Sequence, residues 1–265
     1  MCIAYLAIAA HPEWPLFIAA NRDEFHARQT LPAAPWPDHP DLIAGVDCVA
    51  GGTWLGITRQ GRYALLTNYR DPASVMPNAP SRGHLASDYL IDDIDPRDYA
   101  HRVLDAAGRY NGFNLILGDR QSAWYVGNRA DQEAPQALTP GRYIISNHLL
   151  NTPWPKAERL RQALNGYPSD ALDLSLAPLF EILQDNTPAR DDALPSTGIT
   201  RERERLLSSP FIVSPEYGTR CSTVIAVHAS GRALFSEVSY NASGKATQRH
   251  DWPFLLSHPA PSPVE

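Results

Sequence analysis

The second residue of the chain, Cys2, carries the side chain best suited to covalent chemistry. A cysteine directly after the initiator Met permits removal of that Met, which would place a thiol and a free α-amine on one residue. The α-amine has a pKa of roughly 8, so part of it is neutral at physiological pH and can accept the thiol proton. Cys2 is therefore a candidate N-terminal nucleophile. The competing interpretation is a plain cysteine that opens a buried strand.

A polar cluster, Asn21-Arg22-Asp23-Glu24, follows an apolar run that is separated from the first apolar run by a short turn. Two such runs predict an antiparallel hairpin, which brings the cluster opposite Cys2. In that position Arg22 could hold a thiolate and Asp23 could anchor the α-ammonium. Ordinary ion pairs at a solvated strand end are the alternative, and the proximity to Cys2 favours a functional interpretation.

Three further polar residues stand beside apolar strands. Asn68 and Asn147 each lie at the end of an apolar strand, and their side-chain amides could donate to a developing oxyanion. Arg220 precedes a late strand and could bind a carboxylate or a phosphate. Taken singly, turn chemistry explains each asparagine and a salt bridge at the rim explains the arginine.

Hydrophobic periodicity predicts the elements that must position these residues. Strands are expected at 3–10, 16–20, 52–58, 63–68, 113–117, 123–126, 143–146, 222–227 and 233–238. Helices are expected within 83–110, split at Asp95-Pro96, then over 155–167 and 172–183, whereas the Pro-rich segment 31–40 is expected to be a loop. This order is not a strict βαβ alternation, so it favours an α+β fold of antiparallel sheets layered with helices. The pattern leaves a four-layer αββα sandwich and a two-layer fold open.

The composition is that of an ordinary globular chain. Its 265 residues are 43% hydrophobic and 20% charged, from which we expect one domain over 1–250 and a C-terminal tail over 251–265. A formal net charge of -6 argues against a nucleic-acid partner. The opening apolar stretch is too short to span a membrane and lacks a basic leader, so no integral membrane segment is expected.

Three cysteines without a C-x-x-C pair leave one thiol unpaired under any disulfide scheme, which indicates a reducing, cytoplasmic compartment. The nine histidines show no paired spacing typical of a metal or haem-ligating site, so no metal ligands are assigned.

Eight short motifs, in this order along the chain, resemble the NRDE family, also called transport and Golgi organisation protein 2 homologues. The motifs are Met1-Cys2-Ile3, Asn21-Arg22-Asp23-Glu24-Phe25, Gly51-Gly52-Thr53-Trp54-Leu55-Gly56, Leu66-Thr67-Asn68-Tyr69, Tyr110-Asn111-Gly112-Phe113-Asn114-Leu115, Ser146-Asn147, Thr152-Pro153-Trp154 and Tyr217-Gly218-Thr219-Arg220. The resemblance runs from Met1 to about Tyr240. That family is similar to N-terminal nucleophile hydrolases of the choloylglycine hydrolase and penicillin V acylase type, which implies the four-layer αββα sandwich.

The similarity to those hydrolases also implies site residues. In them a cysteine follows the initiator Met, an Arg-Asn-x-Asp segment ends the second strand, two asparagines serve the oxyanion, and a late arginine assists. The matching positions here are Cys2, Asp23, Asn68, Asn147 and Arg220. The chain departs from the pattern because its arginine follows the asparagine, as Arg22. Positions two apart share a strand face, so Arg22 could still serve.

Two functions of different classes follow from the resemblance, which implies roles in haem trafficking and in lipid or acyl-coenzyme A metabolism. The first is a carrier that binds haem, acyl-coenzyme A or a related amphipathic metabolite and requires no cofactor, with haem as a possible ligand. Its expected contacts are Asn21, Arg22, Asp23, Glu24, Trp54 and Arg220. The alternative is an amidase or thioester hydrolase in which Cys2 attacks an acyl carbonyl while Asn68 and Asn147 stabilise the oxyanion.

Overall fold

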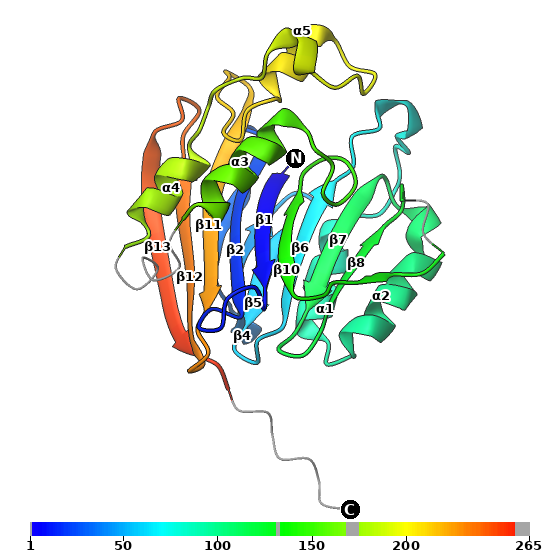
Figure 1. Ribbon diagram of the computed structural model, residues 1–265. Coiled ribbons are helices and arrows are strands. Elements are labelled where there is room, and N and C mark those ends of the chain that lie inside the picture. The colour runs from blue at the N-terminus through cyan, green and yellow to red at the C-terminus, as the bar shows by residue number, and fades with distance from the viewer. Residues whose placement is uncertain (1, 131–132, 168–174, 258–265) are drawn as a thin grey trace, which may run out of the picture.

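Two antiparallel sheets lie face to face in the computed structural model, which describes residues 2–130, 133–167 and 175–257 (Figure 1). The six strands of sheet A follow one another in space as β10 (Gly141–Ile145), β1 (Cys2–Ile8), β2 (Leu16–Phe25), β11 (Tyr217–Val227), β12 (Arg232–Tyr240) and β13 (Ala246–Leu255). The seven strands of sheet B are β3 (Thr30–Trp36), β4 (His39–Asp47), β5 (Leu55–Thr58), β6 (Tyr63–Asn68), β7 (Phe113–Gly118), β8 (Ala123–Gly127) and β9 (Gln136–Ala137).

Helices cover the outer face of each sheet. Sheet B is covered by α1 (Gly83–Ile91) and α2 (Pro96–Asp105), and sheet A by α3 (Pro155–Asn165) and α4 (Ala177–Leu183). The short helix α5 (Arg201–Leu206) lies at the end of the sandwich where β1 begins (Figure 1). Single 3-10 turns occur at Pro72–Ser74, Ala107–Arg109 and Asp191–Ala193. Among the described residues, no helix is both long enough and apolar enough to cross a membrane.

The strand β2 begins with a continuous apolar run because both faces of sheet A are covered. Leu16 and Ile18 face the core between the sheets, whereas Phe17 and Ala19 face the core under α3 and α4. Successive side chains of a strand point to opposite faces, so a strand covered on both faces needs apolar residues at every position. A third core lies between sheet B and its own helices. The expected four-layer αββα sandwich is thereby confirmed.

The segment predicted as a Pro-rich loop is instead an antiparallel hairpin of β3 and β4. Pro32 and Pro35 lie in β3, which is the edge strand of sheet B. A proline cannot donate to a neighbouring strand, but at an edge one side of the strand has no partner, so the missing donor costs little. The proline content therefore predicted a loop, and this prediction is wrong because the segment occupies the edge of a sheet, where prolines are tolerated.

Sheet A also extends beyond the expected domain boundary at residue 250, because β13 runs to Leu255. Its sequence is largely polar since β13 is an edge strand with one exposed face. Phe254 is buried in the core between the sheets, and Trp252 packs against that core. The last part of the expected tail, residues 258–265, lies outside the described residues. Residues 172–174 of the helix predicted over 172–183 lie outside them as well, and α4 begins at Ala177.

Candidate functional site

Cys2 opens β1 with a buried side chain, 7% exposed, at one end of the sandwich. The antiparallel register places Arg22 of β2 directly opposite Cys2, and Cys221 of β11 opposite Arg22 on the other side. The three side chains therefore lie in a row across adjacent strands, on the sheet face that looks toward sheet B. Burial raises the pKa of the Cys2 thiol, so its deprotonation requires a nearby base.

A cleft of about 220 Å³ opens over this row, between the ends of the two sheets. Sheet A contributes Cys2, Arg22, Asp23 and Glu24 to the lining of the cleft, and the turn between β2 and β3 contributes Arg28. The facing wall is built from sheet B and its loops, and includes Asp47, Thr53, Trp54, Leu66, Asn68, Arg82 and Asn111. Six of the nine site residues expected from the sequence line the cleft. The other three, Asn21, Asn147 and Arg220, do not.

Arg22 is the most unusual residue of the cleft because its guanidinium is buried, 6% exposed, without an ionic partner among the described residues. The guanidinium lies 4.2 Å from the centroid of the Trp54 ring, a cation–π contact. Its Nη1 atom is buried and has no hydrogen-bond partner in the described part of the chain. A buried charge costs several kcal/mol, roughly, unless it is paired and hydrogen-bonded, so this arginine is prepared for an anion.

Two other arginines line the same cleft. Arg28 is neutralised by Asp47, at 2.7 Å, whereas Arg82 forms no ion pair within the described residues and donates to the Gly112 carbonyl at 2.8 Å. Burial lowers the pKa of Arg82, although the group stays protonated. The cleft thus presents two arginines, Arg22 and Arg82, that form no ion pair with a carboxylate of the described residues.

Asp23 and Lys156 are two buried groups of opposite charge near the nucleophile, and each shifts the pKa of the other. Asp23 is 0% exposed and accepts a 2.7 Å hydrogen bond from Thr219 Oγ1; burial raises its pKa while Lys156 opposes that shift. Lys156, in the first turn of α3, is 2% exposed, and burial together with Arg70 lowers its pKa to about 8. Two oppositely charged groups with displaced pKa values beside a thiol are typical of a functional site.

The two candidate oxyanion asparagines are in direct contact. Asn147 Nδ2 donates to the Asn68 carbonyl at 3.1 Å, and Asn147 Oδ1 accepts from Lys156 Nζ at 3.3 Å. Ser146 Oγ lies 2.9 Å from the Cys2 carbonyl and 3.2 Å from Asn147 Oδ1. Lys156 and Ser146 therefore set the orientation of the Asn147 amide, with its NH₂ group toward Asn68.

Two of the expected ligand contacts are occupied with holding the fold. Asn21 points to the helix layer, where it donates to the carbonyls of Leu183, at 2.7 Å, and Pro210, at 2.9 Å. Arg220 Nη1 lies 3.0 to 3.2 Å from the carbonyls of Phe25, His26 and Arg28, and so fixes the turn between β2 and β3. Both support the site from behind the cleft wall.

Sequence reasoning missed Arg82 and Lys156. Lys156 had a recognisable signal, because a lysine in the first turn of a helix opposes the helix dipole and is unfavourable there without a special partner. Arg82 had none, since it precedes α1 in an unremarkable turn and reaches the cleft only through the packing of α1 on sheet B.

The family model described as Transport and Golgi organisation 2 matches residues 1–242. The chain belongs to the Transport and Golgi organisation 2 family. A member of this family from Bos taurus is 38% identical over 267 residues, which cover 90% of this chain and 93% of the relative. The Homo sapiens homologue is 34% identical over 258 residues, with the same coverage of both chains. The family membership inferred from the eight motifs is thus confirmed.

Solved structures with a similar course of the chain include an N-acylethanolamine-hydrolyzing acid amidase orthologue from Caenorhabditis elegans. It has a TM-score of 0.47 and 12% identity, over 84% of this chain and 92% of that chain. A conjugated bile acid hydrolase mutant from Clostridium perfringens has a TM-score of 0.43 and 10% identity, over 99% and 100% of the two chains.

Proposed function

We propose that this member of the Transport and Golgi organisation 2 family binds an anionic, amphipathic small molecule, haem or an acyl-coenzyme A in the first instance, with an anionic group on Arg22. The observation that carries the proposal is the buried Arg22 guanidinium, which has no ionic partner among the described residues and an unpartnered Nη1. A carboxylate or phosphate would supply the missing charge and acceptor, and charge-assisted bonds of this kind are the stronger hydrogen bonds in proteins.

The size of the cleft defines which part of such a ligand it takes. At about 220 Å³ it is smaller than the roughly 300–1,000 Å³ of sites that enclose a whole drug-sized molecule. One anionic end fits between Arg22 and Arg82, against the Trp54 ring, while the larger apolar part stays outside. Exposed apolar residues next to lining residues, Val49 beside Ala50 and Phe25 beside Glu24, offer a surface for that part.

The test is a titration of the purified full chain with haemin and with palmitoyl-coenzyme A, comparing wild type with Arg22→Met. Methionine keeps an unbranched apolar stem similar to that of arginine and removes the guanidinium with its charge. We expect affinity to fall tenfold or more, since a charge-assisted hydrogen bond contributes about 1.5–3 kcal/mol. The control is Arg190→Met, which alters an arginine whose side chain is 86% exposed and pairs with Asp192. Equal affinity of wild type and Arg22→Met would reject the proposal.

A second candidate function is hydrolysis of a thioester or amide by Cys2. It is supported by the position of the Cys2 thiol in the cleft, with Asn68 in the facing wall and Asn147 directly behind. After removal of Met1, the α-amine would take the thiol proton while sulfur attacks the carbonyl carbon, and the amide groups would stabilise the oxyanion. The leaving thiol or amine takes the proton as its bond to carbon breaks, and water then cleaves the acyl-enzyme thioester, which restores the Cys2 thiol.

A further inference from the structure

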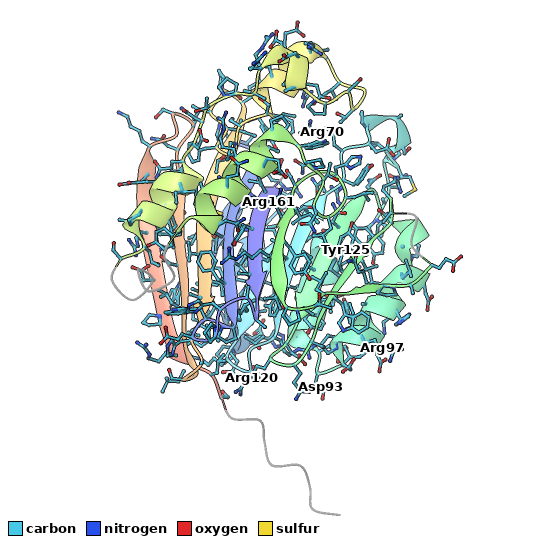
Figure 2. All side chains as sticks on the ribbon, viewed as in Figure 1. Arg70, Asp93, Arg97, Arg120, Tyr125 and Arg161 are labelled. Atoms are coloured by element: carbon cyan, nitrogen blue, oxygen red, sulfur yellow. The ribbon has the colours of Figure 1, made fainter. Side chains whose placement is uncertain are left out.

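A second group of buried polar side chains lies under α5, apart from the cleft. Figure 2 labels Arg70 below α5, just past the end of β6. The Arg70 side chain is 6% exposed, and its Nη1 forms the 2.7 Å ion pair with Glu204 of α5. Tyr217, at the start of β11, shares a small apolar cluster with Leu207, the residue after α5. Neither Arg70 nor Tyr217 lines the cleft, so this group is distinct from the candidate site.

Three polar atoms of this group are buried without a partner. Arg70 Nε, Arg70 Nη2 and the Tyr217 hydroxyl form no hydrogen bond within the described residues. The Trp154 ring, whose centroid lies 4.9 Å from the Arg70 guanidinium carbon, attracts the charge but offers these N–H groups no oxygen. Buried polar groups are almost always hydrogen-bonded, and a buried group without a partner is costly.

All three atoms act as donors. A guanidinium has N–H groups only and no acceptor lone pair. Burial raises the pKa of the Tyr217 phenol, so its hydroxyl keeps the proton and can donate it. The arrangement therefore calls for an acceptor.

Arg70 and Tyr217 converge on one small region. Burial lowers the pKa of Arg70 and raises that of Tyr217, and each group also responds to the charge of the other and of Asp23. The backbone N–H of Arg70 donates to the Asn147 carbonyl at 2.8 Å, and Lys156 Nζ donates to Asn147 Oδ1 at 3.3 Å. One asparagine thus links the arginine to the buried lysine.

The charges around these donors favour an anion over a water molecule. The ion pair with α5 is neutral as a whole. Asp23 lies near two cations, Lys156 and the α-ammonium group of the chain, and both oppose the rise that burial causes in its pKa. Arg22 and Glu24, which act on the same region from the cleft, offset each other. The surroundings therefore hold more positive than negative charge, which a water molecule would leave uncompensated.

We propose that Arg70 and Tyr217 form a buried site for a monoatomic anion, chloride in the first instance, that is separate from the ligand cleft. Arg70 Nε, Arg70 Nη2 and the Tyr217 hydroxyl donate to the ion, and its charge compensates the surrounding cations. Such an ion is little larger than a water molecule, so it needs no cavity of ligand size. Because the donors come from the end of β6 and from β11, the bound ion stabilises the folded chain.

The first test is a crystal structure of the full chain in sodium bromide, because bromide replaces chloride and is located by its anomalous scattering. We expect an anomalous peak within hydrogen-bonding distance of Arg70 and Tyr217. A water molecule at that place, or bromide at Arg22 alone, overturns the proposal.

The second test measures the affinity for chloride in solution. Urea unfolding is followed with increasing sodium chloride, and sodium gluconate keeps the ionic strength constant, which separates anion binding from screening. The parent is Arg22→Met, which removes the unpaired arginine of the cleft as a competing anion site. Adding Tyr217→Phe should weaken the apparent affinity for chloride tenfold or more, the range for a hydrogen bond to a charged group.

Tyr217→Phe keeps the ring in its apolar cluster and removes only the hydroxyl. Without chloride it should be at least as stable as its parent, because a buried hydroxyl without a partner is gone. The matched control is Tyr5→Phe, whose lost hydroxyl donates to Asn165 Oδ1 at 2.9 Å; it should lose stability equally with and without chloride. Unchanged chloride affinity in Tyr217→Phe, or stability that does not depend on chloride in the parent, rejects the site.

Discussion

Cys2 and Arg22 are direct cross-strand neighbours in the antiparallel register of β1 and β2, so a buried thiol and a buried guanidinium share one sheet face. Because side chains alternate along β2, the two residues on either side of Arg22 point the other way. Asn21 and Asp23 bond to the helix layer and to β11, respectively. One four-residue motif therefore serves both the cleft and its support, and the two roles can be separated by mutation.

Cys2→Ala distinguishes a carrier from a hydrolase. If the family member hydrolyses acyl compounds, the variant should form no product from thioester or amide substrates while ligand affinity changes less than about threefold, because transition-state and ground-state contacts differ. In a pure carrier, Cys2→Ala should change nothing that is measured. The measurements are a turnover assay on both substrate classes and a binding titration of the same samples. Turnover that persists in Cys2→Ala would exclude Cys2 as the nucleophile.

Asn21→Ala is expected to weaken the fold rather than ligand binding. The change removes two donors from the buried carbonyls of Leu183 and Pro210 and the acceptor of Ser222 Oγ, at 2.6 Å. Buried groups left unsatisfied cost about 1–3 kcal/mol each, so we expect the free energy of unfolding to drop by about 3 kcal/mol or more. Urea unfolding measures this loss. A ligand titration at urea concentrations below the unfolding transition measures the affinity for the ligand.

The matched variant is Asn68→Ala, because Asn68 lines the cleft and its side chain makes no hydrogen bond within the described part of the chain. It should lose less than about 1 kcal/mol of stability, the usual range for a change that leaves no buried group unsatisfied. A large loss of ligand affinity in Asn21→Ala, without a loss of stability, would contradict the supporting role of Asn21.

Lys156 should make stability depend on pH in a window that follows from its depressed pKa. Burial and Arg70 lower that pKa to about 8, from an ordinary value of 10.5. Between these values the unfolded chain binds more protons than the folded one, so this lysine makes the free energy of unfolding rise with pH. The slope is at most about 1.4 kcal/mol per pH unit, and the benefit is lost as pH falls through 8.

Lys156→Met should remove this slope. Urea unfolding at several pH values from 7 to 10 measures it as the difference between wild type and variant, with Lys245→Met, at an exposed position, as the control. A difference between wild type and Lys156→Met that is constant across the range would show that folding does not lower the pKa of Lys156.

The ion pair between Arg70 and Glu204 should be strongly coupled. The two groups lie 2.7 Å apart, their side chains are 6% and 2% exposed, and Glu204 also accepts from Thr197 N and Oγ1. Glu204→Gln leaves Arg70 buried without its partner, and we expect a loss of about 3–5 kcal/mol of stability. In a double-mutant cycle with Arg70→Met, the combined loss should be clearly smaller than the sum of the single losses. Additive losses would mean that the pair contributes nothing of its own.

Much of the fold follows from local pattern. The apolar runs of β1 and β2 predicted strands covered on both faces, and the separation of α1 from α2 at Asp95-Pro96 is confirmed: the Asp95 side chain accepts from the N–H groups of Arg97 and Asp98. The edge strands β3 and β13 escaped prediction. Their sequences are rich in proline or polar residues, and only their place at the margin of a sheet makes such residues acceptable.

The sequence by itself determined most strands and helices and the neighbourhood of Cys2 and Arg22, because periodicity and hairpin register are local properties of a chain. The family and the αββα layers followed from the resemblance of the eight motifs. Only the tertiary structure decided which polar groups are satisfied. Asn21 and Arg220 find their acceptors in distant segments, whereas the buried Arg22 Nη1 finds none among the described residues. Whether a buried group has a partner depends on atoms brought together from all parts of the chain, and no spacing along the sequence encodes that.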